Sequence, residues 1–422
     1  MNRRFFLSLC AGLVVIPAVL AADWMRFRGP GGQGVSDDKG LPETWSETKN
    51  IVWKTRLPGP GTSSPITVGD AIFLTCYSGY AESPRDPGDQ KNLMRHVVCL
   101  DRKTGVIRWS KDVKPELPES AYRSGNDGQH GYASSTPASD GKGLFVFFGK
   151  SGVFRFDLAG NQVWSRSVGK RTTGWGSATS PLLYNDLVIV NASVESGALV
   201  ALNKSDGSEA WRLSGTAGAW SSPMLVEVPG GKPELVLNLA GRSSKIVGID
   251  PGTGKELWSC EGNNDGYVCA SVVSHDGVVY AIAGRSGRSV AVKAGGTGKV
   301  KELWTSRNDS RVNSPVYHAG HLYWLNEQRG AAMCIDAATG KEVYAQRLAG
   351  IGRAYASGVY ADDKIYYVTD NATTLVIAAK PKYELIATNK LADTSRTNAS
   401  PVIDNGRLLI RTDKYLYCVG KK

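Results

Sequence analysis

One repeated phrase organises almost the whole chain after residue 50. Each copy opens with Ser-Pro or a close variant and continues with three short apolar strands. It then reaches Asp or Asn, a Thr-Gly or Gly turn, and usually a Trp four residues after that Gly. Pro65 and Pro401, in the first and last openings, lie 336 residues and seven intervals apart, or 48 residues per copy. This is the size of one four-stranded propeller blade. The eight openings are Ser64-Pro65, Thr136-Pro137, Ser180-Pro181, Ser222-Pro223, Ala270-Ser271, Ser314-Pro315, Ser357-Gly358 and Ser400-Pro401.

The two ends of the repeat region are displaced by one strand. The eighth copy stops at Val419, before any fourth strand, whereas residues 50–54 hold a lone outer strand with Trp53 and no copy before it. A ring has this arrangement when its N-terminal strand completes the last blade and hides edges that would pair with other chains. Short apolar runs bounded by Gly, Asp and Asn are typical of buried strands. The sequence therefore predicts an all-β fold, an eight-bladed β-propeller of four-stranded antiparallel blades, closed by the N-terminal strand in the last blade.

The Gly in the turn and the Trp on the outer strand are expected to have structural roles. Gly tolerates the positive φ of a tight turn, and the Trp on the outer strand is expected to wedge against a neighbouring blade. Burying one Trp contributes about 2–3 kcal/mol, and its loss would cost about 3–5 kcal/mol. Six of the 11 Trp residues take this slot, and a Tyr takes it in the sixth copy. The predicted blade-docking residues are Trp53, Trp109, Trp164, Trp211, Trp258, Trp304 and Tyr344.

The first 22 residues have the features of an export signal. A basic head with Arg3 and Arg4 precedes an apolar run that ends in a Val-Leu-Ala cleavage site at residue 21. Two arginines before Phe-Phe-Leu also resemble a twin-arginine signal, and the run is too short for a membrane span. We predict a signal peptide over 1–22, an entry segment over 23–49 and one propeller domain over 50–422. The mature protein should be a periplasmic or secreted monomer that does not span a membrane.

Charge and motifs exclude several functions. The formal net charge is +11, but the 50 basic residues are scattered along the chain. Scattered charge favours solubility rather than nucleic-acid binding. The chain has no Gly-x-Ser-x-Gly nucleophile motif, no Cys-x-x-Cys and no zinc-type spacing. We therefore expect no nucleic-acid partner and no metal site.

The cysteines follow the repeat. The penultimate position of the third strand holds small residues in five blades: Cys99, Ala201, Gly248, Cys334 and Cys418. Cys there acts as a small hydrophobe, and equivalent positions in separate blades are too far apart to bond. Cys260 and Cys269, between the fourth and fifth copies, are the disulfide candidate that remains, and Cys76 with Cys99 is a less favoured pair.

Aromatic and arginine side chains gather just before the innermost strands, where they should ring one end of the central channel. They are Tyr132, Trp175, Trp220, Tyr267, Arg311, Arg353, Tyr355 and Arg396. These residue types are common in recognition surfaces, although they could also plug the channel and bond backbone carbonyls. Asp127 and His130 are weaker candidates for a base or a ligand, since a polar loop with Asx turns is the simpler explanation of their segment.

The Asp/Asn, Thr-Gly and Trp repeat closely resembles the pyrroloquinoline-quinone-type (PQQ-like) propeller repeat, from Trp24 to Val419. Residues 24–30 (Trp-Met-Arg-Phe-Arg-Gly-Pro), 41–45 and 130–141 resemble segments of exported PQQ-like propellers of planctomycete-type bacteria. That superfamily includes quinone-dependent alcohol dehydrogenases and the BamB-like scaffold of outer-membrane protein assembly. The resemblance is specific for the fold and implies two different functions.

A quinoprotein dehydrogenase needs a planar quinone, a carboxylate base and Ca²⁺ held by carboxylate and amide oxygens. Several such enzymes stack the quinone on a disulfide of adjacent cysteines, but this chain has no Cys-Cys pair and little spare loop to roof a cofactor. We therefore predict an exported, non-catalytic propeller that acts as a scaffold for a protein, peptide or other ligand, without a cofactor. The alternative is a periplasmic PQQ- and Ca²⁺-dependent alcohol dehydrogenase-like oxidoreductase, which the twin-arginine feature mildly favours.

Overall fold

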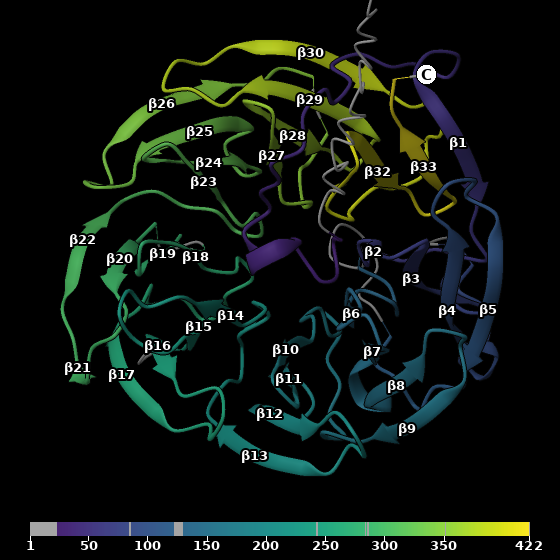
Figure 1. Cartoon of the computed structure of the whole chain (residues 1–422), viewed down its shortest axis with the longest axis horizontal. Coiled ribbons are helices and arrows are strands. Elements are labelled where there is room, and N and C mark those ends of the chain that lie inside the picture. The colour runs from purple at the N-terminus through teal and green to yellow at the C-terminus, as the bar shows by residue number, and fades with distance from the viewer. Residues whose placement is uncertain are drawn as a thin grey trace, which may run out of the picture.

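The computed structural model describes residues 23–83, 86–121, 130–241, 244–282, 284, 287–350 and 352–421. Their strands form eight sheets around a central axis, with the shortest strands innermost and the outer strands along the circumference (Figure 1). The predicted all-β, eight-bladed propeller is confirmed. The signal peptide predicted over 1–22 and the candidate Asp127 lie outside the described residues.

The first four blades run from the innermost to the outermost strand in chain order. Blade one consists of β2 (Ile66–Val68), β3 (Ala71–Ser78), β4 (Met94–Asp101) and β5 (Ile107–Val113). Blade two consists of β6 (Ala138–Ser139), β7 (Gly143–Phe147), β8 (Val153–Asp157) and β9 (Gln162–Arg166). Blade three consists of β10 (Leu182–Tyr184), β11 (Leu187–Ala192), β12 (Ala198–Asn203) and β13 (Glu209–Ser214). Blade four consists of β14 (Met224–Val226), β15 (Glu234–Asn238), β16 (Lys245–Ile249) and β17 (Glu256–Glu261).

The other four blades repeat this order, except that the chain's first strand completes the last one. Blade five consists of β18 (Val273–His275), β19 (Val278–Ala281), β20 (Ser289–Lys293) and β22 (Glu302–Ser306). Blade six consists of β23 (Val316–His318), β24 (His321–Asn326), β25 (Ala331–Asp336) and β26 (Glu342–Arg347). Blade seven consists of β27 (Val359–Ala361), β28 (Lys364–Val368), β29 (Thr373–Ala378) and β30 (Leu385–Lys390). Blade eight consists of β31 (Val402–Asp404), β32 (Arg407–Arg411), β33 (Tyr415–Val419) and β1 (Ile51–Arg56).

Ring closure takes the predicted form. β1 pairs antiparallel with β33, and the register runs from Ile51 opposite Val419 to Arg56 opposite Tyr415. The described helical structure is limited to three single 3-10 turns, η1 (Pro30–Gly32), η2 (Gln90–Asn92) and η3 (Gly149–Ser151). No helix in the described ranges has the length and apolar character needed to cross a bilayer.

The outer-strand tryptophans connect neighbouring blades through the turn glycines. A Cβ placed on Gly105 would lie 2.5 Å from the ring of Trp53, and one placed on Gly254 would lie 2.5 Å from the ring of Trp211. The same relation holds for Trp109 with Gly160, Trp164 with Gly207 and Trp304 with Gly340. Two reasons therefore favour Gly at the turn position. Its φ is positive, and the indole that covers it leaves no room for a Cβ.

The strand register shows why the position opposite the Trp is small in blades one, three and four. Cys99, Ala201 and Gly248 lie directly opposite Trp109, Trp211 and Trp258, and the register shifts immediately after each of them. A Cβ on Gly248 would lie 2.1 Å from Nε1 of its Trp partner. The bulge and the small residue together make room for the indole.

Trp258 is the exception to the docking rule. It is fully buried, and its Nε1 donates a hydrogen bond of 2.6 Å to Oε2 of Glu234. The same carboxylate oxygen accepts the backbone N–H of Gly295 at 3.1 Å. The two extra residues in the fifth copy's turn let β21 (Gly298–Lys299) pair in parallel with β17, so blade four has a short fifth strand at its edge.

The Cys260–Cys269 disulfide considered above is wrong, because both cysteines are free, as are the other four described ones. Cys260 is buried in the outer strand β17, whereas Cys269 lines the central channel. The segment between them crosses the blade from its outer edge to the axis, which separates the two sulfurs.

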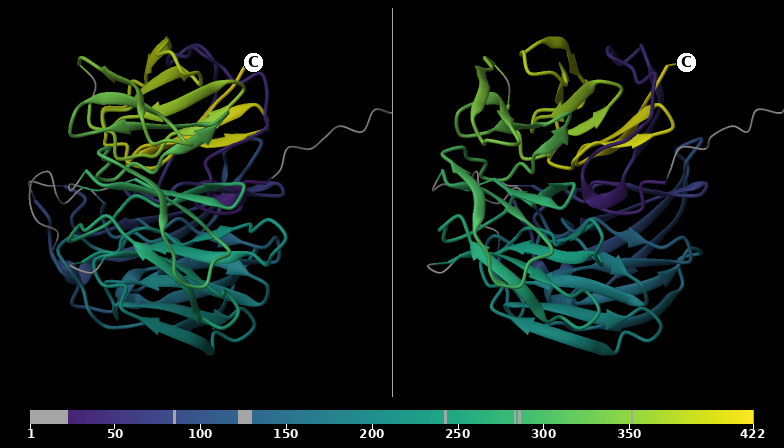
Figure 2. Two further views of the ribbon diagram at one scale, coloured as in Figure 1. Left: turned by 90° about the vertical axis from the view of Figure 1, so that its left-hand side faces the viewer. Right: turned by 60° about the vertical axis from the view of Figure 1, so that its left-hand side comes forward.

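The entry segment crosses the ring rather than only leading into it. Its first part lies at the centre in Figure 1 and toward one face of the ring in Figure 2. Backbone carbonyls of Trp24 and Met25 accept N–H groups from inner strands β2 and β6, in blades one and two. Gly34 and Ser36 bond β27 of blade seven, and the Gln33 side chain bonds Ser274 of β18 in blade five. The segment therefore ties together blades on opposite sides of the axis.

Candidate binding site in the central channel

A chain of hydrogen bonds around the axis explains why the opening of every repeat copy contains Ser or Thr. In seven successive pairs, the backbone N–H of this residue donates to the hydroxyl of its equivalent in the next blade, at 2.9–3.0 Å. The series runs through Ser64, Thr136, Ser180, Ser222, Ser271, Ser314, Ser357 and Ser400. We call these eight residues the hydroxyl ring.

The hydroxyl ring is interrupted where blade eight meets blade one, and Arg411 bridges the two blades at this junction. This side chain is buried, and its Nη1 donates to the backbone carbonyl of Ser63 at 2.7 Å and to the Ser63 hydroxyl at 2.5 Å. Its Nη2 lies 3.4 Å from Sγ of Cys76. A cationic hydrogen-bond donor thus strengthens the junction between the two ends of the chain.

All eight residues of the hydroxyl ring line one cavity of about 300 Å³ on the axis. Phe27 of the entry segment also lines this cavity. The entry segment bonds positions that follow the hydroxyl ring along the inner strands, such as Thr67 and Ser139, whereas the predicted mouth residues precede the ring. Phe27 and the mouth therefore lie on opposite sides of the hydroxyl ring, and the channel is a cup with Phe27 at its base.

A second layer of the cup comes from the position two residues before each hydroxyl. Residues two apart in an extended chain project to the same side, and all eight of these residues line the cavity: Thr62, Ser134, Ala178, Trp220, Cys269, Val312, Tyr355 and Asn398. The three from blades eight, one and two are polar. The five from blades three to seven are mostly apolar or aromatic. The wall of the cup is therefore polar on one side and apolar on the other.

Five of the predicted mouth residues line the cavity: Trp175, Trp220, Tyr267, Arg311 and Tyr355. Two hydrogen bonds fix their orientation. Nε1 of Trp220 donates to the carbonyl of Gly176 at 2.8 Å, which ties blade four to the loop before blade three. Nε of Arg311 donates to the Tyr267 hydroxyl at 3.0 Å. Trp220, Tyr267 and Arg311 are therefore held in place by hydrogen bonds within the protein.

Three other predicted mouth residues do not line the cavity. Tyr132 is buried, and its hydroxyl donates to the carbonyl of Ser120 at 3.0 Å. Arg353 is exposed. Nε of Arg396 forms an ion pair with Oδ2 of Asp413 at 3.1 Å, and burial raises the pKa of that carboxyl. The sequence placed these residues near the axis but could not give the direction of their side chains.

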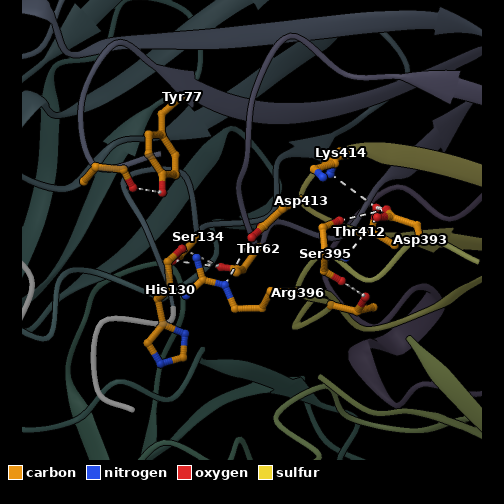
Figure 3. A network of polar contacts seen from close by, with 12 residues as sticks. Thr62, Tyr77, His130, Ser134, Asp393, Ser395, Arg396, Thr412, Asp413 and Lys414 are labelled. Carbon is orange, nitrogen blue, oxygen red and sulfur yellow. Dashed lines mark hydrogen bonds and ion pairs between the residues drawn. The ribbon is translucent and has the colours of Figure 1, made fainter. Parts of the chain in front are cut away.

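The weaker candidate His130 does line the cavity. Its backbone carbonyl accepts hydrogen bonds from the hydroxyls of Thr62 and Ser134 at 3.0 and 2.9 Å, which anchor its loop beside the Arg396 network (Figure 3). Its ring lies edge-on to Tyr355, 6.2 Å away between centroids. Burial lowers the pKa of His130 to about 4, and nearby arginines reinforce this shift. The imidazole is therefore neutral at physiological pH.

Sequence reasoning missed two features of this site, the hydroxyl ring and the Phe27 base. The signal for the ring was present: Ser271 and Ser357 keep the hydroxyl in the two copies that lack the Pro. It also missed two buried carboxyls outside the cavity, Glu195 and Glu327. Burial raises the pKa of each to about 7, and no repeat position marks them.

The described cavity does not fit a quinone–calcium centre. Among the described residues its lining contains no Asp or Glu, so these residues offer neither a carboxylate base nor the carboxylate oxygens that usually bind Ca²⁺. No cluster of three or more His, Cys, Asp or Glu side chains suited to a metal occurs within the described part of the chain. The charged and polar groups of the lining are hydroxyls, one amide, one neutral imidazole and one guanidinium.

The fold and the repeat define a PQQ-like β-propeller. A family model described as outer membrane protein assembly factor BamB matches residues 35–173 and, overlapping these, 93–346. The chain therefore belongs to this PQQ-like repeat family. No curated protein sequence matches the chain.

Solved structures with the same fold include both scaffold and enzyme. BamB from Moraxella catarrhalis is similar with a TM-score of 0.60 and 13% identity, over 88% of this chain and 97% of that one. A europium-containing methanol dehydrogenase has a TM-score of 0.60 and 12% identity, over 92% and 89% of the two chains. The quinohemoprotein alcohol dehydrogenase from Comamonas testosteroni has a TM-score of 0.60 and 12% identity, over 95% and 81%. At these identities the likeness establishes the fold alone.

Proposed function

We propose that the protein is an exported, non-catalytic propeller that binds a partner or ligand at the mouth of its central cup. The observation that carries this proposal is the cup itself. Trp175, Trp220, Tyr267, Tyr355 and Arg311 line an axial cavity, whose other side is lined by the entry segment. Tryptophan, tyrosine and arginine are the residues that most often dominate binding energy at interfaces.

The family match supports a scaffold, because the family model carries the description of an outer-membrane protein assembly factor. The export signal predicted over residues 1–22 would deliver such a scaffold to the periplasm or the exterior. A protein or peptide partner at the mouth is consistent with both observations.

The chemistry of the cup supports binding rather than catalysis. Quinone-dependent oxidation needs a carboxylate base beside the quinone and Ca²⁺ on hard oxygen ligands. The described lining supplies Arg311 and His130 in place of carboxylates. For this reason we do not propose the PQQ- and Ca²⁺-dependent dehydrogenase as the function, although the fold is shared with such enzymes.

Affinity capture from envelope extracts of the source organism tests the proposal. The bait is the mature protein, and the double variant Trp175→Ala with Trp220→Ala is compared with Val163→Ala, which changes an exposed side chain on the outer strand β9. We expect a partner retained by the wild type and by Val163→Ala but lost by the double variant, with far-UV circular dichroism unchanged. Equal capture by all three baits would show that the mouth is not the binding surface.

Reconstitution tests the alternative directly. The mature protein is incubated with PQQ and Ca²⁺, freed of excess quinone, and assayed for a bound chromophore and dye-linked alcohol oxidation. We expect neither. Retained quinone with turnover would contradict the non-catalytic reading.

A further inference from the structure

We propose that the cup binds a single terminal sugar ring of an oligosaccharide. This inference rests on the proposed function as a binding protein and names the ligand class that fits the cup. Three properties of the cavity carry it: the unused hydroxyl donors of the ring, the two-sided wall and the small size.

The hydroxyl ring presents hydrogen-bond donors to the cavity. Each hydroxyl from Thr136 to Ser400 accepts a backbone N–H, but none donates to an acceptor in the described residues. A hydroxyl has one donor and two acceptor positions, so each keeps its O–H. The hydroxyl oxygen of Ser64 is inaccessible and has no hydrogen-bond partner in the described residues, so the donors considered for a ligand are those of the other seven residues. Convergent O–H groups in a buried site are satisfied by water or by a ligand rich in oxygen acceptors.

The second layer adds an apolar face opposite a polar one. Trp220 and Tyr355 are on the apolar side, and the hydroxyls of Thr62 and Ser134 are on the other. A pyranose ring has the matching character, with C–H groups on its faces and hydroxyls around its edge. Because the Trp220 indole is held by its bond to Gly176, the aromatic surface is rigid and loses little entropy on binding.

The size and closure of the cavity limit the ligand to one ring. A volume of about 300 Å³ corresponds to about ten water molecules and is at the lower end of small-molecule sites. This space suits one hexose with its hydroxyls and is too small for a folded peptide segment. With Phe27 at the base of the cavity, a longer glycan can place only its terminal residue inside.

The polar groups of the cup are suited to the hydroxyls of a sugar. The part of the lining that the structure describes has one cationic side chain, Arg311, and no carboxylate, and the imidazole of His130 is neutral at physiological pH because burial depresses its pKa. A neutral imidazole offers one donor and one acceptor, as a sugar hydroxyl requires. The guanidinium of Arg311, already bonded to the Tyr267 hydroxyl, has further N–H donors for sugar oxygens.

A glycan array screened with the mature protein provides the test, followed by calorimetric titration of the best-bound oligosaccharide. Trp220→Ala removes the aromatic surface and should weaken binding about tenfold or more. Tyr355→Phe removes the hydroxyl of a side chain that lines the cavity and that makes no hydrogen bond through this hydroxyl to the described residues. It should leave the melting temperature unchanged and weaken binding about 2- to 12-fold. Val163→Ala is the matched control and should bind as the wild type does.

Three results would overturn the proposal. They are the absence of any array signal, sugar binding that neither cup variant weakens, and saturable binding of the dipeptide Gly-Trp or of benzoate in place of sugars. The capture experiment separates this inference from the broader one. A partner lost by the Trp175 and Trp220 double variant, together with a silent array, would refute the sugar and leave the binding scaffold intact. Failure of both experiments would refute both proposals.

Discussion

The docking of an outer-strand tryptophan on the next blade's turn glycine can be tested by adding one methyl group. Gly254 has a φ of +73°, and a Cβ there would lie 2.5 Å from the ring of Trp211. Gly320 has a φ of +78°, and a Cβ there would have nothing within 4 Å. The pair Gly254→Ala and Gly320→Ala therefore imposes the same backbone strain and differs in the clash with the indole.

The two costs can be separated. An alanine in the left-handed region costs about 1–2 kcal/mol at either position. At position 254 the methyl must also displace Trp211, which is nearly fully buried and whose Nε1 donates to the carbonyl of Pro251 at 3.1 Å. Losing most of the burial of that ring adds about 2–3 kcal/mol. We expect Gly254→Ala to destabilise by about 3–5 kcal/mol and Gly320→Ala by about 1–2 kcal/mol.

Urea denaturation followed by far-UV circular dichroism measures both variants, with thermal melting as a second assay. The entropy of unfolding is about 0.8 kcal/mol/K for a chain of roughly 400 residues, so the expected difference separates the two melting temperatures by about 3 °C. Equal losses in the free energy of unfolding for Gly254→Ala and Gly320→Ala would refute the docking argument. A third variant, Trp211→Ala with Gly254→Ala, should cost less than the sum of its parts, because the clash is then gone.

Three further predictions concern buried polar groups and cysteines. In Glu195→Gln, the amide oxygen keeps an acceptor for the Ser177 hydroxyl. Since burial raises the pKa of Glu195 from 4.5 to about 7, the wild type has its full stabilisation below pH 4.5 and loses it as pH rises through 7. The variant should therefore gain up to about 3 kcal/mol relative to the wild type between pH 4.5 and pH 8, and a pH-independent difference in urea titrations would contradict this. Glu234→Ala leaves the indole N–H of Trp258 and the N–H of Gly295 unbonded and should cost about 2–5 kcal/mol; an unchanged urea midpoint would show that this bridge is dispensable. Thiol titration of the denatured mature protein without reductant should give six free thiols, and a value of four would mean that a disulfide forms.

The fold could be predicted from the sequence because the repeat imposes the same physical demands eight times. A turn with positive φ, a large outer side chain and a small residue opposite it leave a pattern that survives substitution, as Tyr344 and Gly248 illustrate. The lone N-terminal strand with Trp53 then indicated that this strand completes the last blade and closes the ring. The fifth copy's two extra turn residues were visible, but their pairing with β17 depends on an edge in another blade and has no local signal.

The site was only partly predictable, for two physical reasons. The direction of a loop side chain depends on its neighbours in other blades, so Tyr132 and Trp175 looked alike in sequence although only the latter lines the cavity. The entry segment lies outside the repeat, so the position of Phe27 could not be read from the register. The disulfide prediction failed for a similar reason: only eight residues separate Cys260 from Cys269 along the chain, but those residues cross the blade from its edge to the axis.

The repeat divides each blade into positions that the fold needs and positions that it leaves free. The hydroxyl position is Ser or Thr in all eight copies, and in seven of them its oxygen accepts the N–H of the preceding blade. The position two residues earlier also lines the cup, yet it holds eight different residue types, from Ala178 to Trp220. A position that faces the axis but has no common bond to make can vary without cost to the fold. Under the proposed binding function, specificity therefore belongs to that second layer. Substitutions there should change what the cup binds while leaving unfolding nearly unaltered, whereas loss of a hydroxyl that accepts an N–H, such as that of Ser222, should also lower the free energy of unfolding.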